Sequence, residues 1–95
     1  MKKTFPLQVT GRDDARVRDK IRQTVNSTVR RSRRRAPVEG FDGWDFKCKV
    51  GVNEPNAARC SLKEVGRVIE DIAQLGVSEI YVEVVAVPIK RGPTV

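Results

Sequence analysis

The stretch W-D-F-K-C-K-V, residues 44–50, carries the clearest structural signal in the sequence. Apolar and charged residues alternate along it, and this period of two is typical of a strand with one buried face. The residues expected on the buried face are Trp44, Phe46, Cys48 and Val50. Residues 51–56 then combine Gly, Asn and Pro, which indicates a turn that ends the strand. Such a strand needs a second layer to cover its apolar face.

The residues that follow predict a helix and then another strand. Ser61 and Glu64 have the spacing of a capping box, and Gly76 stands where a left-handed C-terminal cap is expected. The apolar face expected between them consists of Leu62, Val65, Val68, Ile69, Ile72 and Leu75. Residues 79–87 are rich in β-branched residues and carry apolar side chains on both faces. We therefore expect this strand at the centre of the sheet.

A further strand is expected over residues 4–9, where apolar residues again alternate. Pro6 has no N–H to donate, so this strand should lie at an edge. With a helix between this strand and residue 44, the order is β-α-β-α-β. The elements predict an α+β two-layer sandwich, a three-stranded sheet with two helices on one face and the last strand between the first two. Residues 1–95 are expected to form a single domain with a frayed tail at 91–95.

The first helix is the basic part of the chain. Asp13 or Thr10 can cap its start, and the residue before Pro37 is pushed out of the α region, so the helix should end near Arg35. Its apolar stripe is Val17, Ile21, Val25 and Val29. On the opposite face, where Asp19 is the one acidic residue, we expect Arg16, Lys20, Gln23, Asn26, Ser27, Arg30, Arg33 and Arg34.

Positive charge is concentrated in this region. The formal net charge is +7; residues 1–40 hold 12 Lys and Arg against 4 Asp and Glu, whereas residues 41–95 hold 7 against 8. Five arginines fall within six positions: Arg30, Arg31, Arg33, Arg34 and Arg35. Like charges four residues apart destabilise a helix, but cations in its last turn are favoured by the helix dipole. Because these two effects nearly cancel, the fact that the helix tolerates the arginine cluster does not by itself argue for a function. A basic face that lacks acidic counterparts predicts a polyanionic partner.

These observations favour a non-enzymatic protein that binds nucleic acid, more readily RNA or a ribosomal site than a specific DNA sequence, because no base-reading motif is evident. The residues expected to bind are Arg16, Lys20, Arg30, Arg31, Arg33, Arg34 and Arg35. Two alternatives stay open: a basic end that is only solvated, and a surface that docks on an acidic protein partner.

Two aromatic residues invite further hypotheses. Tyr81, beside Lys47 and Lys49, could stack on a base at an exposed sheet face, although a cross-strand pair between Lys47 and Glu83 is the simpler interpretation. Trp44 could border a groove, although packing in the core is simpler.

Other chemistry finds little support. The chain has no histidine, which excludes a cysteine-histidine nucleophile and histidine metal ligands, and it lacks a glycine-rich phosphate loop. Cys48 is expected to be an inert packing residue. Cys60 is expected to pack on Val65, although its place before a helix and beside Arg59 could lower its thiol pKa. We expect no cofactor, no metal and no membrane segment, and a soluble cytoplasmic protein.

The chain resembles a family of small bacterial proteins, domain of unknown function 6172. The stretches that carry the resemblance are M-K-K-T-F-P-L (1–7), R-R-S-R-R-R-A-P-V-E-G (30–40), W-D-F-K-C (44–48) and Y-V-E-V-V-A-V-P (81–88). The resemblance covers nearly the whole chain. It implies a bacterial cytoplasmic protein of one domain, and it supplies no catalytic residue and no ligand.

Overall fold

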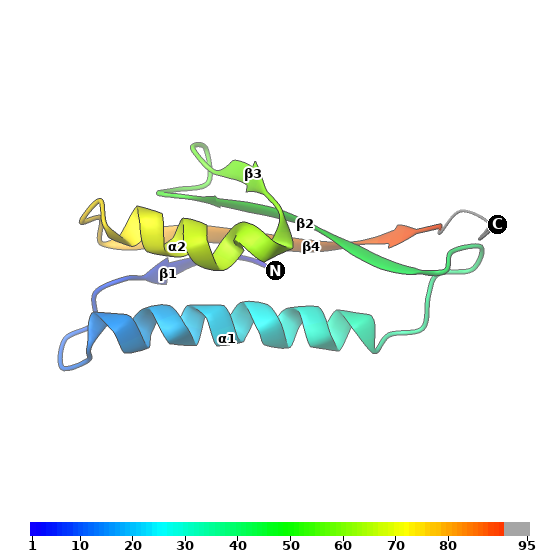
Figure 1. Ribbon diagram of the computed structural model, residues 1–95, viewed down its shortest axis with the longest axis horizontal. Helices are drawn as coiled ribbons and strands as arrows, with labels where there is room; N and C mark the ends of the chain where they lie inside the picture. The colour runs from blue at the N-terminus through cyan, green and yellow to red at the C-terminus, as the bar shows by residue number, and fades with distance from the viewer. Residues whose placement is uncertain (91–95) are drawn as a thin grey trace.

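The computed structural model describes residues 1–90, with four strands, two helices and a short 3-10 turn before the second helix (Figure 1). The elements in chain order are β1 (Lys2–Pro6), α1 (Asp14–Arg33), β2 (Gly43–Gly51), β3 (Ala58–Cys60), η1 (Leu62–Glu64), α2 (Val65–Ala73) and β4 (Glu79–Ile89). The tail predicted to fray, 91–95, lies outside the described residues.

The sheet has the order β1-β4-β2-β3, and all neighbours are antiparallel. The last strand therefore does lie between the first two, as its apolar composition predicted. The three-stranded sheet was wrong, because β3 adds a fourth strand. Its three residues are too few to show an alternating pattern. They pair only because the turn at 52–57 brings Cys60 opposite Cys48 and Ala58 opposite Val50.

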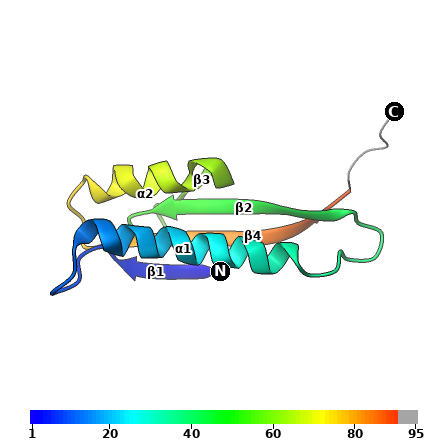
Figure 2. The ribbon, with the colours of Figure 1, turned by 60° about the horizontal axis from the view of Figure 1, so that its bottom comes forward.

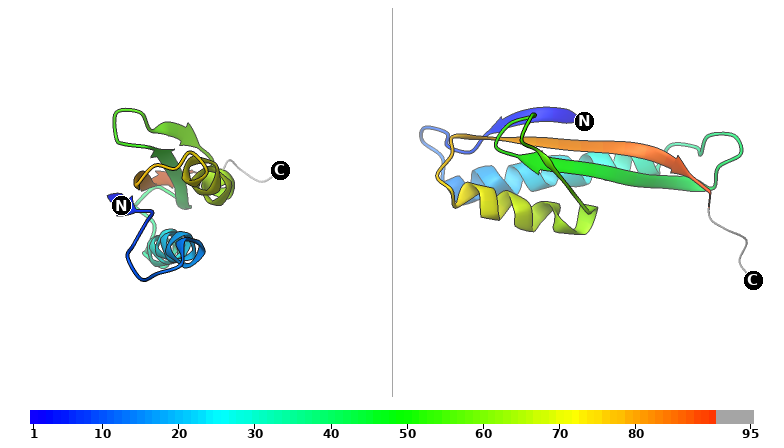
Figure 3. Two further views of the ribbon diagram at one scale, coloured as in Figure 1. Left: turned by 90° about the vertical axis from the view of Figure 1, so that its left-hand side faces the viewer. Right: turned by 90° about the horizontal axis from the view of Figure 1, so that it is seen from above.

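Both helices cover the same face of the sheet, which confirms the two-layer α+β arrangement (Figures 2 and 3). The buried core between the layers consists of Phe5, Leu7, Ile21, Val25, Val29, Phe46, Cys48, Val50, Val65, Ile69, Ile80, Val82 and Val84. The apolar stripe predicted for α1 is buried as expected. Leu75 was wrongly assigned to the core: it is 69% exposed, because α2 ends at Ala73 and Leu75 follows it.

The helix ends follow local chemistry closely. Asp13 caps α1 by accepting a hydrogen bond from the Ala15 N–H at 3.0 Å. The helix ends at Arg33 with Arg34 as its C-cap, close to the end predicted near Arg35. Before α2, the predicted capping box forms, with the Glu64 carboxylate accepting from the Ser61 N–H at 3.1 Å. Gly76 has a φ of 75°, the left-handed conformation expected after the helix.

The open edges of the sheet are protected against pairing with another strand. Met1 and Val84 exchange hydrogen bonds at 2.7 and 2.8 Å, so alternate residues of β1 direct their backbone groups toward β4 and the others toward solvent. Pro6 falls in the solvent-directed set, which confirms its edge position. In β4, the backbone nitrogen of Pro88 faces the edge that β1 leaves open, so no N–H is presented to solvent there. At the open edge of β2, the Asp45 carboxylate accepts from the Phe46 N–H at 2.8 Å.

An ion-pair group ties α1 to α2. Glu70 of α2 accepts hydrogen bonds from Arg18, at 3.0 Å, and from Arg22 of α1, and Arg22 also donates to Asp19 at 2.7 Å. Partial burial alone would raise the pKa of Glu70, but the hydrogen bonds from the two arginines outweigh it and hold the pKa below its ordinary value. Two cations of α1 are thus used within the fold.

The close approach of the 52–57 turn to β2 leads to a stability prediction. A Cβ on Gly51 would lie 2.6 Å from the Ala57 Cα, which is backbone and cannot move aside. We expect Gly51→Ala to lower the free energy of unfolding by about 1–3 kcal/mol in a urea titration. The matched control is Gly43→Ala in the same strand, where the added Cβ meets nothing within 4 Å and the change should stay within about 0.5 kcal/mol. Equal midpoints for both variants would contradict this close approach.

The Glu70 ion pairs predict a pH-dependent contribution to stability. Because the pKa of Glu70 is lowered by folding, the stabilisation is present above the ordinary value of about 4.3 and is lost as the pH falls through the folded-state pKa. The side chain is 35% exposed, so Glu70→Gln should cost less than about 1 kcal/mol at pH 7. Unfolding measured from pH 3 to 8 should show the difference from wild type vanish in acid. Asp71→Asn is the control, and a constant difference across the range would contradict the assignment.

Candidate nucleic-acid interface

The cations of α1 and of the two residues after it fall into three groups with different surroundings. Arg18 and Arg22 point toward α2 and bind Glu70. Arg33 and the following Arg35 lie over aromatic rings. The remaining cations are exposed and form what we call the outward face: Arg16, Lys20, Arg30, Arg31 and Arg34. With about 100° between successive residues, these five positions share the side of α1 opposite its apolar stripe.

The outward face is fully available to solvent. All five of its side chains are exposed, and none forms an ion pair with another residue among 1–90. Asp19, which was expected to interrupt this face, is engaged by Arg22 instead. From Arg16 to Arg34 the face extends about 27 Å at 1.5 Å per residue. At its C-terminal end, Arg30, Arg31 and Arg34 border a hollow of about 270 Å³ with Ser27.

Arg33 was wrongly assigned to the outward face. It lies four residues after Val29, so it continues the buried stripe of α1 rather than the opposite side. Its guanidinium lies 5.5 Å from the centroid of the Phe46 ring. Over an aromatic face the guanidinium keeps its charge in water while its stem covers apolar surface. Arg33 therefore borders the sheet instead of joining the solvent-facing cations.

Arg35 and Trp44 form a stacked pair just beyond the end of α1. The Arg35 guanidinium lies 4.6 Å from the centroid of the Trp44 ring, and the Trp44 Nε1–H donates to the Arg35 carbonyl at 3.2 Å. We call Arg33, Arg35, Trp44 and Phe46 the aromatic–arginine cluster. A hollow of about 310 Å³ adjoins it, lined by Arg33, Arg35, Pro37, Asp42, Gly43 and Trp44. Trp44 is only partly buried, so the groove hypothesis for this residue agrees with the structure.

Sequence reasoning missed this cluster. Arg35 and Trp44 are nine positions apart, and the sequence does not predict the path of the loop between them. The pairing depends on where the loop returns the chain to the sheet, and no spacing rule encodes that return. The one available signal was a tryptophan at the end of a strand, close to an excess of arginine.

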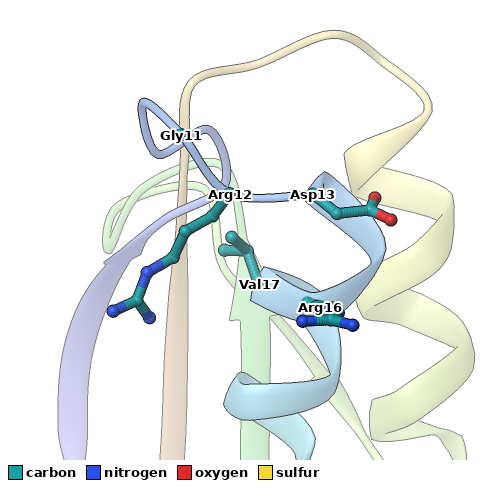
Figure 4. A pocket seen from close by; sticks show the side chains of 5 residues that line it. All are labelled: Gly11, Arg12, Asp13, Arg16 and Val17. Carbon is teal, nitrogen blue, oxygen red and sulfur yellow. The ribbon is translucent and has the colours of Figure 1, made fainter.

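A third hollow lies at the other end of α1, as Figure 4 shows. It measures about 410 Å³ and is lined by Gly11, Arg12, Asp13, Arg16 and Val17. The side chains of Arg12 and Asp13 leave the backbone in opposite directions. Asp13 already caps the helix here, so its carboxylate occupies the position that a bound anion would take. This hollow extends the basic surface through Arg12, but it is not an anion cradle.

The uncovered face of the sheet differs from the expectation. Tyr81 is 4% exposed and its hydroxyl donates to Glu83 at 2.8 Å; burial, together with this bond, raises its pKa to about 12. It cannot stack on a base, because it is buried; the strand register places it opposite Gly51, the last residue of β2. The register also places Lys49 opposite Glu83 and Lys47 opposite Val85, so the predicted pair of Lys47 with Glu83 was wrong.

The two cysteines have the properties of packing residues. Burial raises the pKa of Cys48 to about 11, with contributions from Cys60 and Asp45, and burial followed by Glu64 raises the pKa of Cys60. The alternative of a thiol with a lowered pKa at Cys60 is therefore wrong. No group of three or more His, Cys, Asp or Glu side chains in residues 1–90 could hold a metal ion. None of the helices in this part of the chain is long and apolar enough to cross a membrane.

Comparisons with known proteins give one positive result. The model of a family of unknown function, DUF6172, matches residues 1–94, which confirms the resemblance seen in the sequence. No curated protein and no solved structure matches the chain. With its match over almost the full length, the chain belongs to the DUF6172 family of unknown function.

Proposed function

We propose that this protein binds nucleic acid, RNA above all, by laying the outward face of α1 along a phosphate backbone. The observation that carries the proposal is the contrast within a single helix. Arg18 and Arg22 form ion pairs with Glu70, and Arg22 pairs with Asp19 as well, whereas the five cations of the outward face have no ion-pair partner in residues 1–90. If helix stability alone had shaped this face, acidic residues would be expected between its cations, where they would form stabilising pairs.

The geometry of the outward face suits a backbone rather than a small anion. Its charges are spread over about 27 Å instead of converging on a point. Arginine, which supplies four of its five cations, offers a planar fork of donors that matches phosphate oxygens. If all five cations neutralise phosphates, the salt slope is about −4.5 on a duplex and about −3.5 on a single strand.

The surroundings of α1 favour binding without base readout from this helix. The helix packs against a sheet and beside α2, and its outward face presents mainly arginine and lysine. It lacks the helix-turn-helix arrangement that inserts a second helix into a DNA groove. Contacts of this kind set position and affinity, and they carry little sequence information. As the family resemblance implies, we place this activity in the bacterial cytoplasm.

The test compares two variants with the same loss of charge. Arg30→Gln/Arg31→Gln/Arg34→Gln removes three cations from the outward face, and Lys2→Gln/Lys47→Gln/Arg59→Gln removes three exposed cations from the uncovered sheet face. Binding of labelled RNA is followed by fluorescence polarisation at rising salt. We expect the first variant to reduce the salt slope by about 2 to 2.7 and the second to leave it within about 0.5 of wild type.

Three outcomes would overturn the proposal. The first is that wild type does not bind RNA at low salt. The second is that both variants weaken binding equally, because this would mean that only net charge matters. The third is that an acidic polypeptide binds the outward face tightly while RNA does not displace it, which would identify the docking of an acidic protein as the function.

A further inference from the structure

We propose that the aromatic–arginine cluster is a site for one unpaired nucleobase, so that the natural ligand of this protein is single-stranded nucleic acid. This inference rests on the proposed function and names its substrate class. The cluster adjoins the C-terminal end of the outward face, since Arg34 lies directly between Arg33 and Arg35 in the chain. A strand held by its phosphates on that face therefore passes the Trp44 ring.

The Trp44 ring is held in the way that a stacking platform requires. Its inner side packs on the hydrophobic core, and its Nε1–H is fixed by the Arg35 carbonyl. The adjoining hollow of about 310 Å³ is at the small end of ligand pockets, which suits a nucleobase better than a larger ligand. Proteins that read single strands use such aromatic faces because every base offers a π-face.

The Arg35 guanidinium that lies over the Trp44 ring can be displaced by a ligand. Arg35 is exposed and lies beyond the end of α1, and it is held over the ring by a cation–π contact. A base stacked on an aromatic ring is bound more strongly than an exposed cation–π pair, so a base can take the place of the guanidinium. The displaced guanidinium then becomes available to a phosphate of the same strand. Arg33 stays over Phe46 and contributes charge beside the base.

The loop that frames the cluster has the exposed apolar surface that a binding site shows. Within residues 1–90, the exposed large hydrophobic side chains are Val38, Phe41 and Leu75, and the first two belong to this loop. Phe41 is 39% exposed and stands three positions before Trp44. On the uncovered face of the sheet, by contrast, Tyr81 is buried. The stacking surface of this protein is therefore at the loop end of α1.

Trp44 is the only tryptophan in the chain, so its fluorescence reports directly on this site. The probes are a single-stranded oligouridylate and an oligoadenylate of twelve nucleotides, a blunt RNA duplex of the same length, and inorganic polyphosphate. At saturation we expect both single strands to quench Trp44 emission, because a base stacks on the ring. The duplex and polyphosphate should compete for the outward face but leave the emission within about a tenth of its free value.

Variants separate stacking from charge. Trp44→Leu should weaken binding of labelled single strands by about 5- to 150-fold, the equivalent of one stacked base, and leave duplex binding unchanged. Trp44→Phe keeps an aromatic ring and should retain most of the single-strand affinity. Arg35→Ala should lower affinity for all four probes but preserve the quenching by single strands. Thermal unfolding of each variant checks that the fold is intact, and if Trp44→Leu does not fold, wild-type quenching and Arg35→Ala decide.

The inference is overturned if single strands bind without quenching, if duplex and polyphosphate quench equally, or if Trp44→Leu folds and binds single strands as wild type does. The proposed function survives each of these results, because they leave the outward face as the binding surface. It fails separately, if the outward-face variant retains full binding.

Discussion

The antiparallel pairing of β2 with β4 is the interaction on which the rest of the structure depends. Nine residues of β2 pair in unbroken register, from Gly43 opposite Ile89 to Gly51 opposite Tyr81. This register places Phe46, Cys48 and Val50 of β2 on the same face as Val82 and Val84 of β4, where α1 and α2 cover them. A slip by one residue would place the two apolar rows on opposite faces of the sheet, so burial of one face holds the register in place.

The same pairing also positions the candidate interface. One half of the β2–β4 pair extends beyond both β1 and β3. There β2 and β4 form a two-stranded ribbon, at the end of the molecule where α1 stops (Figure 1). Pro88 and Asp45 protect the open edges of the ribbon, which makes extension by a further strand unfavourable. The ribbon instead presents the Trp44 ring to Arg35 and the Phe46 ring to Arg33. The β2–β4 ribbon therefore supports the basic C-terminal end of α1.

Arginines with similar sequence surroundings have different roles in this protein because the neighbouring elements differ along α1. Near its start, α2 lies beside the helix and supplies Glu70, so Arg18 and Arg22 become part of the fold. Near its end, α2 supplies no acidic side chain, and the neighbours are aromatic rings or solvent. Burying a charge without a partner is costly, and each arginine therefore finds an anion, a π-face or water.

Local signals predicted a large part of this structure. The capping residues Asp13 and Ser61, the left-handed Gly76, the edge position of Pro6 and the buried stripe of α1 all follow from chemistry within a few residues. Strand β3 could not be predicted, because three residues carry no periodicity and pair only when the turn at 52–57 presents them to β2. Tyr81 was misplaced because alternation within a strand does not show whether other parts of the chain bury the side chains of its outer face.

By itself, the sequence determined the helix and strand types, the family and the concentration of positive charge before residue 40. These depend on periodicity and composition, which are local properties. Only the tertiary structure decided which arginines pair with Glu70, which lie on Trp44 and Phe46, and which five cations of the outward face stay exposed. The reason is physical: the state of a charge depends on its neighbours in space, and packing brings those neighbours from segments as far apart as Arg18 and Glu70.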